Sequence, residues 1–353
     1  MSRGKATSRG RGLRLVFVVT ALVAGAIGFW MVDRYLRFAD EPVQGIEAGA
    51  SLQVESGDNF ADVLRKLHAQ GMPSVRDPEW QLLSRQLGAA GRLQVGEYAL
   101  RQGITPRQLL MDMRNGKVIS RRFTIVEGWS LRQVRAALAR AKLLQHDTAE
   151  LDGAALMEAL GHPGVHPEGR FLPETYLYTR GDSDLDLLRR SYDAMQRTLD
   201  HAWESRAKGL PLDSKDEALV LASIVEKETG VAEERPRIAG VFLRRLEKGM
   251  RLQTDPTVIY GMGEDYAGNI RRADLARDTP YNTYTRTGLP PTPIAMPGAA
   301  ALQAVTHPAD GDALYFVAVG DGSGRHVFSA NLAEHQAAVR AYLKRYRAQR
   351  SGQ

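Results

Sequence analysis

The longest apolar stretch of the chain lies near its start, at residues 15–32, and carries no charge. A helix of that length measures about 27 Å at about 1.5 Å per residue, which is most of the roughly 30 Å hydrocarbon core of a bilayer. Trp30 and Tyr35 lie at its C-terminal end, and such aromatic side chains favour the membrane interface. The pattern therefore predicts a transmembrane helix over residues 15–32.

Basic residues precede this run and predict its orientation. Five of them lie in the first fourteen residues, with no acid among them: Arg3, Lys5, Arg9, Arg11 and Arg14. The rest of the chain is nearly balanced in charge. A positive flank stays cytoplasmic, so we expect residues 1–14 to be a cytoplasmic tail and the chain from about residue 33 to be exported. A cleaved signal peptide is the competing interpretation, because Ala24-Gly-Ala26 has a small-x-small pattern, although the apolar run continues past it.

A short helix-start pattern recurs three times after this segment. Each copy has a glycine, an Asn, Thr or Ser two residues later, and an Asp or Gln three residues after that. The Asn, Thr or Ser is a good N-cap, and the later side chain can return the capping bond. The three predicted N-caps are Asn59, Thr105 and Ser130. The interval of about 30 residues between the first two predicted helices is interpreted as a loop.

The alternation of strand-like and helix-like segments predicts an α+β fold. Residues 122–126 and the pair 314–319 and 325–328 have strand character, the latter two forming a hairpin, and residues 332–347 read as a closing helix. The chain is predicted to consist of a tail at 1–14, a transmembrane helix at 15–32, a linker at 33–50, a small α+β subdomain at 51–120 and a larger mixed α+β domain at 121–350.

The most informative helix is predicted at residues 216–229. Leu221, Ile224 and Val225 share one face of it by the 3.6-residue period, and Glu228 falls on that face. An acid beside apolar neighbours in the last turn has a raised pKa, which suits a general acid. Glu226 is the rival, on a less apolar flank. The plain alternative for either glutamate is a surface residue paired with a basic neighbour.

Polar and aromatic residues follow in two loops. Asp255, before a proline, is expected to N-cap a helix, and the functional alternative makes it the second carboxylate of a glycosidase pair. The run Tyr-Asn-Thr-Tyr-Thr at 281–285 is followed by a proline-rich stretch. Amides and hydroxyls can bind sugar hydroxyls and flat rings can cover pyranose faces, so these loops are compatible with a sugar site. A rigid surface loop is the other interpretation.

The sequence lacks the motifs of several common enzyme classes. The chain has no cysteine, its histidines are scattered, and no His-Glu-x-x-His, Gly-x-Ser-x-Gly or P-loop sequence occurs. No basic face outside the N-terminal tail suggests nucleic-acid binding. We therefore expect no metal, no cofactor and no nucleic-acid partner.

Long motif blocks give the chain a resemblance to a known family. They are Pro-Glu-Gly-Arg-Phe-Leu-Pro-Glu-Thr-Tyr at 167–176, Ala-Ser-Ile-Val-Glu-Lys-Glu-Thr at 222–229, Arg-Leu-Gln-Thr-Asp-Pro-Thr-Val-Ile-Tyr-Gly at 251–261 and Tyr-Asn-Thr-Tyr-Thr at 281–285. With these blocks the chain resembles the endolytic murein transglycosylases, or YceG-like family. In addition, Gly-Asp-Asn at 57–59 before a helix resembles the start of a LysM carbohydrate-binding module.

The resemblance implies a single-pass inner-membrane enzyme with a periplasmic catalytic domain and a LysM-like subdomain. It implies lytic cleavage of the β-1,4 bond between MurNAc and GlcNAc in nascent peptidoglycan strands, leaving 1,6-anhydroMurNAc ends and terminating elongation, with peptidoglycan synthases as partners. Glu228 is then the catalytic residue. The same blocks supply candidate substrate-binding residues: Gln253, Thr254, Asp255, Thr257, Tyr260, Tyr281, Asn282, Thr283 and Tyr284. The alternatives are a muramidase that uses Glu228 with Asp255, and a non-enzymatic scaffold that binds peptidoglycan.

Overall fold

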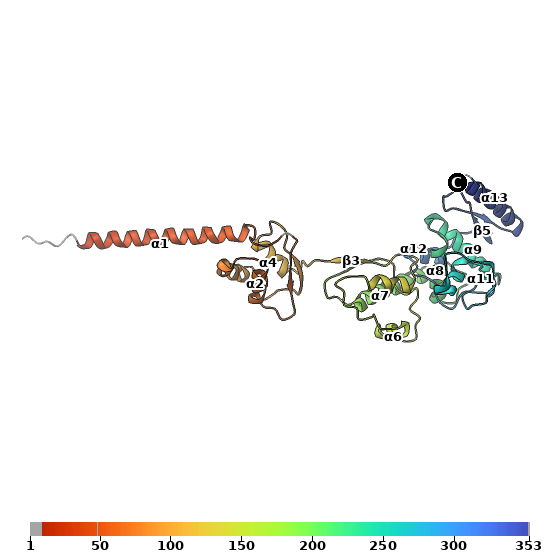
Figure 1. Ribbon diagram of the computed structural model, residues 1–353, viewed down its shortest axis with the longest axis horizontal. Helices are drawn as coiled ribbons and strands as arrows, with labels where there is room; N and C mark the ends of the chain where they lie inside the picture. The colour runs from red at the N-terminus through yellow and green to blue at the C-terminus, as the bar shows by residue number, and fades with distance from the viewer. Residues whose placement is uncertain (1–8, 48, 352–353) are drawn as a thin grey trace, which may run out of the picture. The chain divides into compact units, whose positions relative to one another are not determined.

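The structure, a computed structural model, describes residues 9–47 and 49–351, so Arg3 and Lys5 of the expected tail lie outside the described residues. The chain divides into two compact units, Met1–Arg121 and Arg122–Gln353. Figure 1 shows helices and short strands in both, and the mixed α+β fold with an N-terminal apolar helix predicted from the sequence is confirmed.

The first unit begins with a single long helix, α1 (Arg9–Asp40). By length and composition its Leu13–Asp40 segment is apolar enough to cross a membrane, and the apolar window is not buried against the rest of the protein. The linker expected over residues 33–50 is wrong in its first part, because the helix continues to Asp40. Phe38 and Ala39 are buried in the core of the unit, and this packing extends the helix beyond the apolar run.

The remainder of the first unit is a strand–helix–helix–strand arrangement followed by one more helix. Its elements are β1 (Ser51–Val54), α2 (Phe60–Ala69), the short 3-10 helix η1 (Ser74–Arg76), α3 (Asp77–Gln86), β2 (Gly96–Ala99) and α4 (Pro106–Arg114). Strands β1 and β2 pair antiparallel, from Ser51 opposite Ala99 to Val54 opposite Gly96. The loop expected between the first two predicted helices is wrong, because it contains α3, whose Trp80 and Leu83 are buried at helical spacing.

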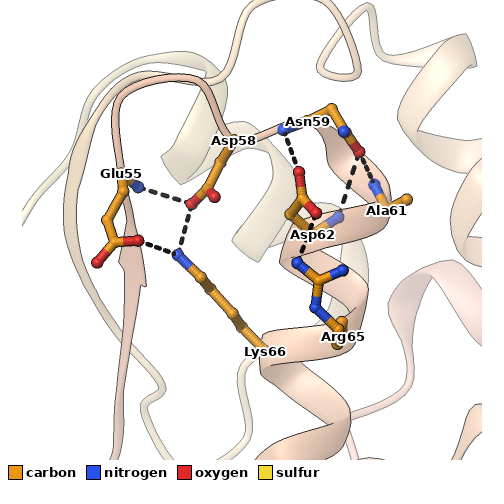
Figure 2. A network of polar contacts seen from close by, with 7 residues as sticks. All are labelled: Glu55, Asp58, Asn59, Ala61, Asp62, Arg65 and Lys66. Atoms are coloured by element: carbon orange, nitrogen blue, oxygen red, sulfur yellow. Dashed lines mark hydrogen bonds and ion pairs between the residues drawn. The ribbon is translucent and has the colours of Figure 1, made fainter.

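The predicted helix starts are confirmed at all three positions. Asn59, Thr105 and Ser130 each cap a helix with a reciprocal capping box. Figure 2 shows the first of them: Asn59 Oδ1 accepts from the backbone N–H groups of Ala61 and Asp62, and Asp62 accepts from the N–H of Asn59. In the same network Lys66 Nζ bridges Asp58 at 2.6 Å and Glu55 at 3.0 Å, which ties the loop after β1 to α2.

The second unit is built around two hydrophobic clusters. The first packs the pair β3 (Arg121–Thr124) and β4 (Thr175–Tyr178) with α5 (Leu131–Leu138), α6 (Gly153–Ala159) and one side of α7 (Asp184–Glu204). The second packs α7, α8 (Lys215–Glu228), α9 (Arg235–Glu247) and α12 (Ala299–Thr306). Helix α8 is buried from Ala218 to Val225, so it is the central helix of this cluster.

Shorter elements complete the second unit. They are η2 (Ala232–Glu234), α10 (Asp255–Met262), η3 (Gly263–Asp265), α11 (Arg272–Ala276), β5 (Tyr315–Ala318), β6 (His326–Ser329) and α13 (Leu332–Ser351). Strands β5 and β6 form the predicted antiparallel hairpin, and α13 packs on it as the predicted closing helix. Figure 1 shows this hairpin and α13 together at the C-terminal end of the chain.

Candidate active site

A cleft of about 480 Å³ opens at the C-terminal end of α8. Glu228 is the last residue of that helix and lies at the cleft, with the buried apolar residues Ile224 and Val225 in the turn before it. The cleft is also lined by residues of β5 and α13, among them Tyr315, Phe316 and His335. One acid from a buried helix therefore shares the cleft with aromatic side chains from the C-terminal end of the chain.

The environment of Glu228 favours its protonated form. The pKa of Glu228 is raised to about 7, chiefly by burial and in smaller part by the charge of Asp255, while a hydrogen bond from Thr254 and the charge of Arg245 act in the opposite direction. The Thr254 hydroxyl donates that bond to Glu228 Oε1. The carboxyl group therefore holds its proton close to neutral pH and can pass to the ionised form there, as a general acid and base requires.

Glu226, the rival acid, does not line the cleft. Its side chain is 5% exposed, accepts a hydrogen bond from the Gly298 N–H at 2.9 Å, and lies 3.5 Å from a guanidinium nitrogen of Arg235. Burial also raises the pKa of Glu226. Its contacts join α8 to α9 and to the start of α12, which is a structural arrangement.

The expected N-cap role of Asp255 is wrong by one residue. Helix α10 starts at Asp255, the preceding Thr254 is in the capping position, and the Thr254 side chain does not cap the helix. Its hydroxyl is instead bonded to Glu228. Asp255 lines the cleft and accepts a hydrogen bond of 2.6 Å from the Tyr284 hydroxyl. The helix start thus presents its polar groups to the catalytic candidate and the cleft.

Two of the predicted residues lie behind Thr254 and hold it in place. Thr257 and Thr283 are buried, and their hydroxyls are 2.9 Å apart. Thr257 donates to the carbonyl of Thr254 at 2.7 Å, and the N–H of Thr254 donates to the Thr283 hydroxyl at 3.1 Å. Neither threonine lines the cleft, so their contacts make them supports for the residue that touches Glu228.

Gln253 lines the cleft in an unusual backbone conformation, with φ of +51°. Non-glycine residues are held in this left-handed region only where the surroundings determine it, and such positions concentrate at functional sites. Arg245, from α9, fixes the preceding residues by donating to the carbonyls of Arg251 and Leu252, and it also donates to Leu314 beside β5. One buried guanidinium therefore connects both sides of the cleft.

Asn282 is a buried loop residue that does not line the cleft. Its side-chain amide donates to the carbonyls of Asp274, Leu275 and Arg277, and its oxygen accepts from the N–H of Tyr284. Asn282 therefore shapes the loop that presents Tyr284.

Tyr260 and Tyr281 belong to a different part of the second unit. Their rings pack edge to face at 4.8 Å, and the Tyr281 hydroxyl pairs with Thr292. The Tyr260 hydroxyl donates to Glu168 at 3.0 Å, at the edge of a separate cleft. Glu168 also accepts from the N–H of Leu131, and burial raises the pKa of Glu168 to about 7. Its contacts join α5 and α10.

Sequence patterns did not single out three residues of the main cleft: Arg245, Tyr315 and His335. Tyr315 and His335 stack with ring centroids 5.1 Å apart, and the Arg245 guanidinium lies 5.1 Å from the Tyr315 centroid. Nδ1 of His335 is buried and has no hydrogen-bond partner within the described residues. Tyr315 could be noticed in the sequence as an aromatic residue of the predicted hairpin. That its side chain lines the cleft depends on the packing of β5 against α13, which the sequence pattern does not show.

Comparison with known proteins places the chain in a family. The YceG-like family model matches residues 52–341, and the chain belongs to that family. An endolytic murein transglycosylase of Bacillus subtilis (strain 168) is 32% identical over 321 residues, covering 86% of this chain and 88% of that protein. The enzyme of the same name from Streptococcus pneumoniae serotype 2 is 29% identical over 68% of this chain, which spans 48% of that longer protein.

A solved structure shows the same architecture. The crystal structure of a YceG-like protein from Listeria monocytogenes aligns with a TM-score of 0.52 and 27% identity. The alignment covers 82% of this chain and 98% of the Listeria chain.

Proposed function

We propose that this protein is a lytic transglycosylase that cleaves peptidoglycan glycan strands internally, with Glu228 as its acid and base. The observation that carries the proposal is the Glu228 carboxyl group at the cleft, whose pKa is raised to about 7, chiefly by burial. The names of the relatives, endolytic murein transglycosylase, support this substrate and this reaction. The proposed bond is the β-1,4 linkage between MurNAc and GlcNAc.

The reaction needs one residue for two proton transfers. Protonated Glu228 donates its proton to the glycosidic oxygen as the bond from that oxygen to C1 of MurNAc breaks. The C6 hydroxyl of the same MurNAc then bonds to C1 and gives its proton to the Glu228 carboxylate. The products are a GlcNAc end with a free hydroxyl and a 1,6-anhydroMurNAc end, and no water is consumed. Because the nucleophile belongs to the substrate, no second carboxylate is required to place it.

Neighbouring residues are suited to this cycle. The Thr254 hydroxyl can stay bonded to Glu228 in both protonation states, since a hydroxyl donates to a carboxylate and accepts from a carboxylic acid. The stacked rings of Tyr315 and His335 offer a flat surface to a sugar face. Gln253 and Tyr284 contribute an amide and a hydroxyl to the same cleft as Asp255. We assign these residues to substrate binding and Glu228 to chemistry.

A muramidase that uses Glu228 with Asp255 is the second candidate. Asp255 lines the same cleft, and its charge contributes to the raised pKa of Glu228. Hydrolysis would need Asp255 to place a water molecule or act as a nucleophile. Its Oδ1 already accepts a hydrogen bond from Tyr284, which favours a binding role for Asp255. The chemistry of the new chain end separates the two candidates.

The proposed location of the enzyme rests on α1 and on the basic residues before it. We propose a single-pass anchor in the inner membrane, with the N-terminus in the cytoplasm and both folded units in the periplasm. The basic residues before the apolar run support this orientation, and the continuation of α1 into the first unit supports a retained anchor in place of a cleaved signal. A cut made close to the membrane would terminate new strands, with peptidoglycan synthases as functional partners.

The test compares the full chain in detergent with two variants on purified glycan strands, reading products by mass. Glu228→Gln removes the acid, and Glu247→Gln is the matched control, because Glu247 is an exposed glutamate at the end of α9. We expect anhydro-ended fragments from the wild type and from Glu247→Gln, and none from Glu228→Gln. Equal activity in all three would refute the role of Glu228. Activity in none would favour a scaffold.

A further inference from the structure

The first unit is attached rigidly to its apolar helix. Phe38, near the end of α1, is 4% exposed, and its ring packs edge to face on Trp80 of α3 at 5.4 Å. Arg34 Nε donates to Glu79 at 2.9 Å, and the Arg76 guanidinium donates to the carbonyl of Arg34 at 3.1 Å. One helix contains both the apolar run and these contacts. The depth at which the apolar run lies in a membrane therefore sets the distance of the first unit from the membrane surface.

An apolar groove lies where α1 meets η1 and α3. It measures about 470 Å³, and its walls come from both segments: Trp30, Met31, Val32, Arg34 and Tyr35 on one side, and Val75, Pro78, Glu79 and Leu82 on the other. Val75 is 73% exposed, Leu82 is 55% exposed and Trp30 is 58% exposed. Exposed apolar side chains gathered in one groove commonly mark an interaction site.

The level of this groove follows from the length of the helix. Residues 15–32 cover about 27 Å, so Trp30, Met31 and Val32 lie in the last turn of the hydrocarbon-spanning part. The polar interface adds only about 5–8 Å on each side of the hydrocarbon core. Val75 and Leu82 line the same groove as these three residues, and they therefore reach the membrane interface.

We propose that this groove seats a phospholipid of the leaflet next to the first unit, so that Val75 and Leu82 insert into the interface beside Trp30. The inference rests on the proposal that α1 spans a membrane. A phospholipid fits because the groove is continuous with the lipid-facing helix and is apolar between Trp30 and Leu82. Arg34, whose side chain is 41% exposed, lines the groove and is paired with Glu79, and the guanidinium N–H groups that this pair does not use can donate to a phosphate. The first unit then lies against the bilayer surface.

The chain suits a labelling experiment because it contains no cysteine. Single-cysteine variants Val75→Cys and Leu82→Cys of the full chain would carry a nitroxide in nanodiscs that hold one chain in phosphatidylethanolamine and phosphatidylglycerol. Val95→Cys is the matched control, because Val95 is an apolar residue of the same unit, 59% exposed, that does not line the groove. Leu22→Cys reports on the span itself. The readout is collision with oxygen, which enters lipid, and with a water-soluble nickel chelate.

We expect nickel accessibility at positions 75 and 82 to be severalfold lower than at position 95, with oxygen accessibility higher. Nickel accessibility at 75 and 82 equal to that at 95, with Leu22→Cys shielded, would overturn this inference and leave the anchor standing. Nickel access at position 22 as well would overturn the anchor and the inference with it. Shielding of 75 and 82 only when two chains share a nanodisc would identify a second copy as the occupant, and would also overturn it.

Discussion

The hydrogen bond from Thr254 to Glu228 offers a direct perturbation of the proposed acid. Replacing Thr254 by Val keeps the volume of the side chain and removes the only hydroxyl that donates to this carboxylate within the described residues. Hydrogen bonds to charged groups contribute roughly 1.5–3 kcal/mol and neutral ones roughly 0.5–1.5 kcal/mol, so the Thr254 hydroxyl favours the ionised form of Glu228 by roughly 1–1.5 kcal/mol. Since one pKa unit corresponds to about 1.4 kcal/mol, the pKa of Glu228 should rise by roughly one unit from about 7 when this bond is lost.

The direction of the effect on activity follows from the role of the acid. Glu228 must be protonated to donate its proton to the glycosidic oxygen, so kcat/KM falls on the basic side as Glu228 ionises. Thr254→Val should move this basic limb to higher pH by roughly one unit. The assay is the pH dependence of kcat/KM on glycan strands, with products quantified by mass.

Two control variants make this measurement specific. Thr254→Ser keeps the hydroxyl and should keep the basic limb of the wild type. Thr257→Val loses a buried hydrogen bond to the Thr254 carbonyl and should lower stability. The N–H of Thr254 still donates to Thr283 and Thr254 keeps its hydroxyl, so the limb should stay in place. A limb that stays at the wild-type pH in Thr254→Val, or moves to lower pH, would refute the reasoning.

Three further outcomes are expected. Glu228→Gln should be more stable than the wild type above pH 7, by up to about 3 kcal/mol, and equally stable below about pH 4.5. The reason is that the raised pKa of Glu228 in the folded state stabilises the wild type only at low pH, and this stabilisation is lost as the pH rises through about 7. Thermal melts at both pH values check the sign. His335→Ala should raise KM for glycan strands more than it lowers kcat, because His335 lines the cleft without touching Glu228, as steady-state kinetics would show; a pure loss of kcat would contradict a binding role. Asn282→Ala should cost about 3 kcal/mol of stability by leaving backbone carbonyls without donors, so an unchanged melting temperature would contradict the loop-shaping role.

Local sequence patterns predicted the helix starts well. At Asn59, Thr105 and Ser130 the capping bonds join residues only two or three positions apart, so the sequence contains all the interacting groups. At α8 the apolar spacing was less informative, because the helix is buried on all sides from Ala218 to Val225 and the Glu226 side chain is buried as well. Glu228 lies at the cleft because it is the last residue of the helix. The start of α10 was off by one residue because Thr254 makes a bond across the fold in place of a local cap.

Contacts between distant segments were not predictable from spacing. Arg245 and His335 are ninety positions apart, and only the packing of β5 between α9 and α13 places both at one cleft. Tyr260 shares a motif block with Asp255, yet it lines another cleft, because a residue five positions along a helix faces a different direction. Helix α3 and the extension of α1 were missed because their burial depends on each other.

The central claim is that one carboxyl group cleaves the strand and that the sugar supplies its own nucleophile. The most direct measurement is digestion of glycan strands by the full chain in ¹⁸O-labelled water, with the new ends read by mass. We expect 1,6-anhydroMurNAc ends that contain no ¹⁸O. Reducing MurNAc ends that carry ¹⁸O would contradict it and identify hydrolysis, with Asp255 as the residue to replace next.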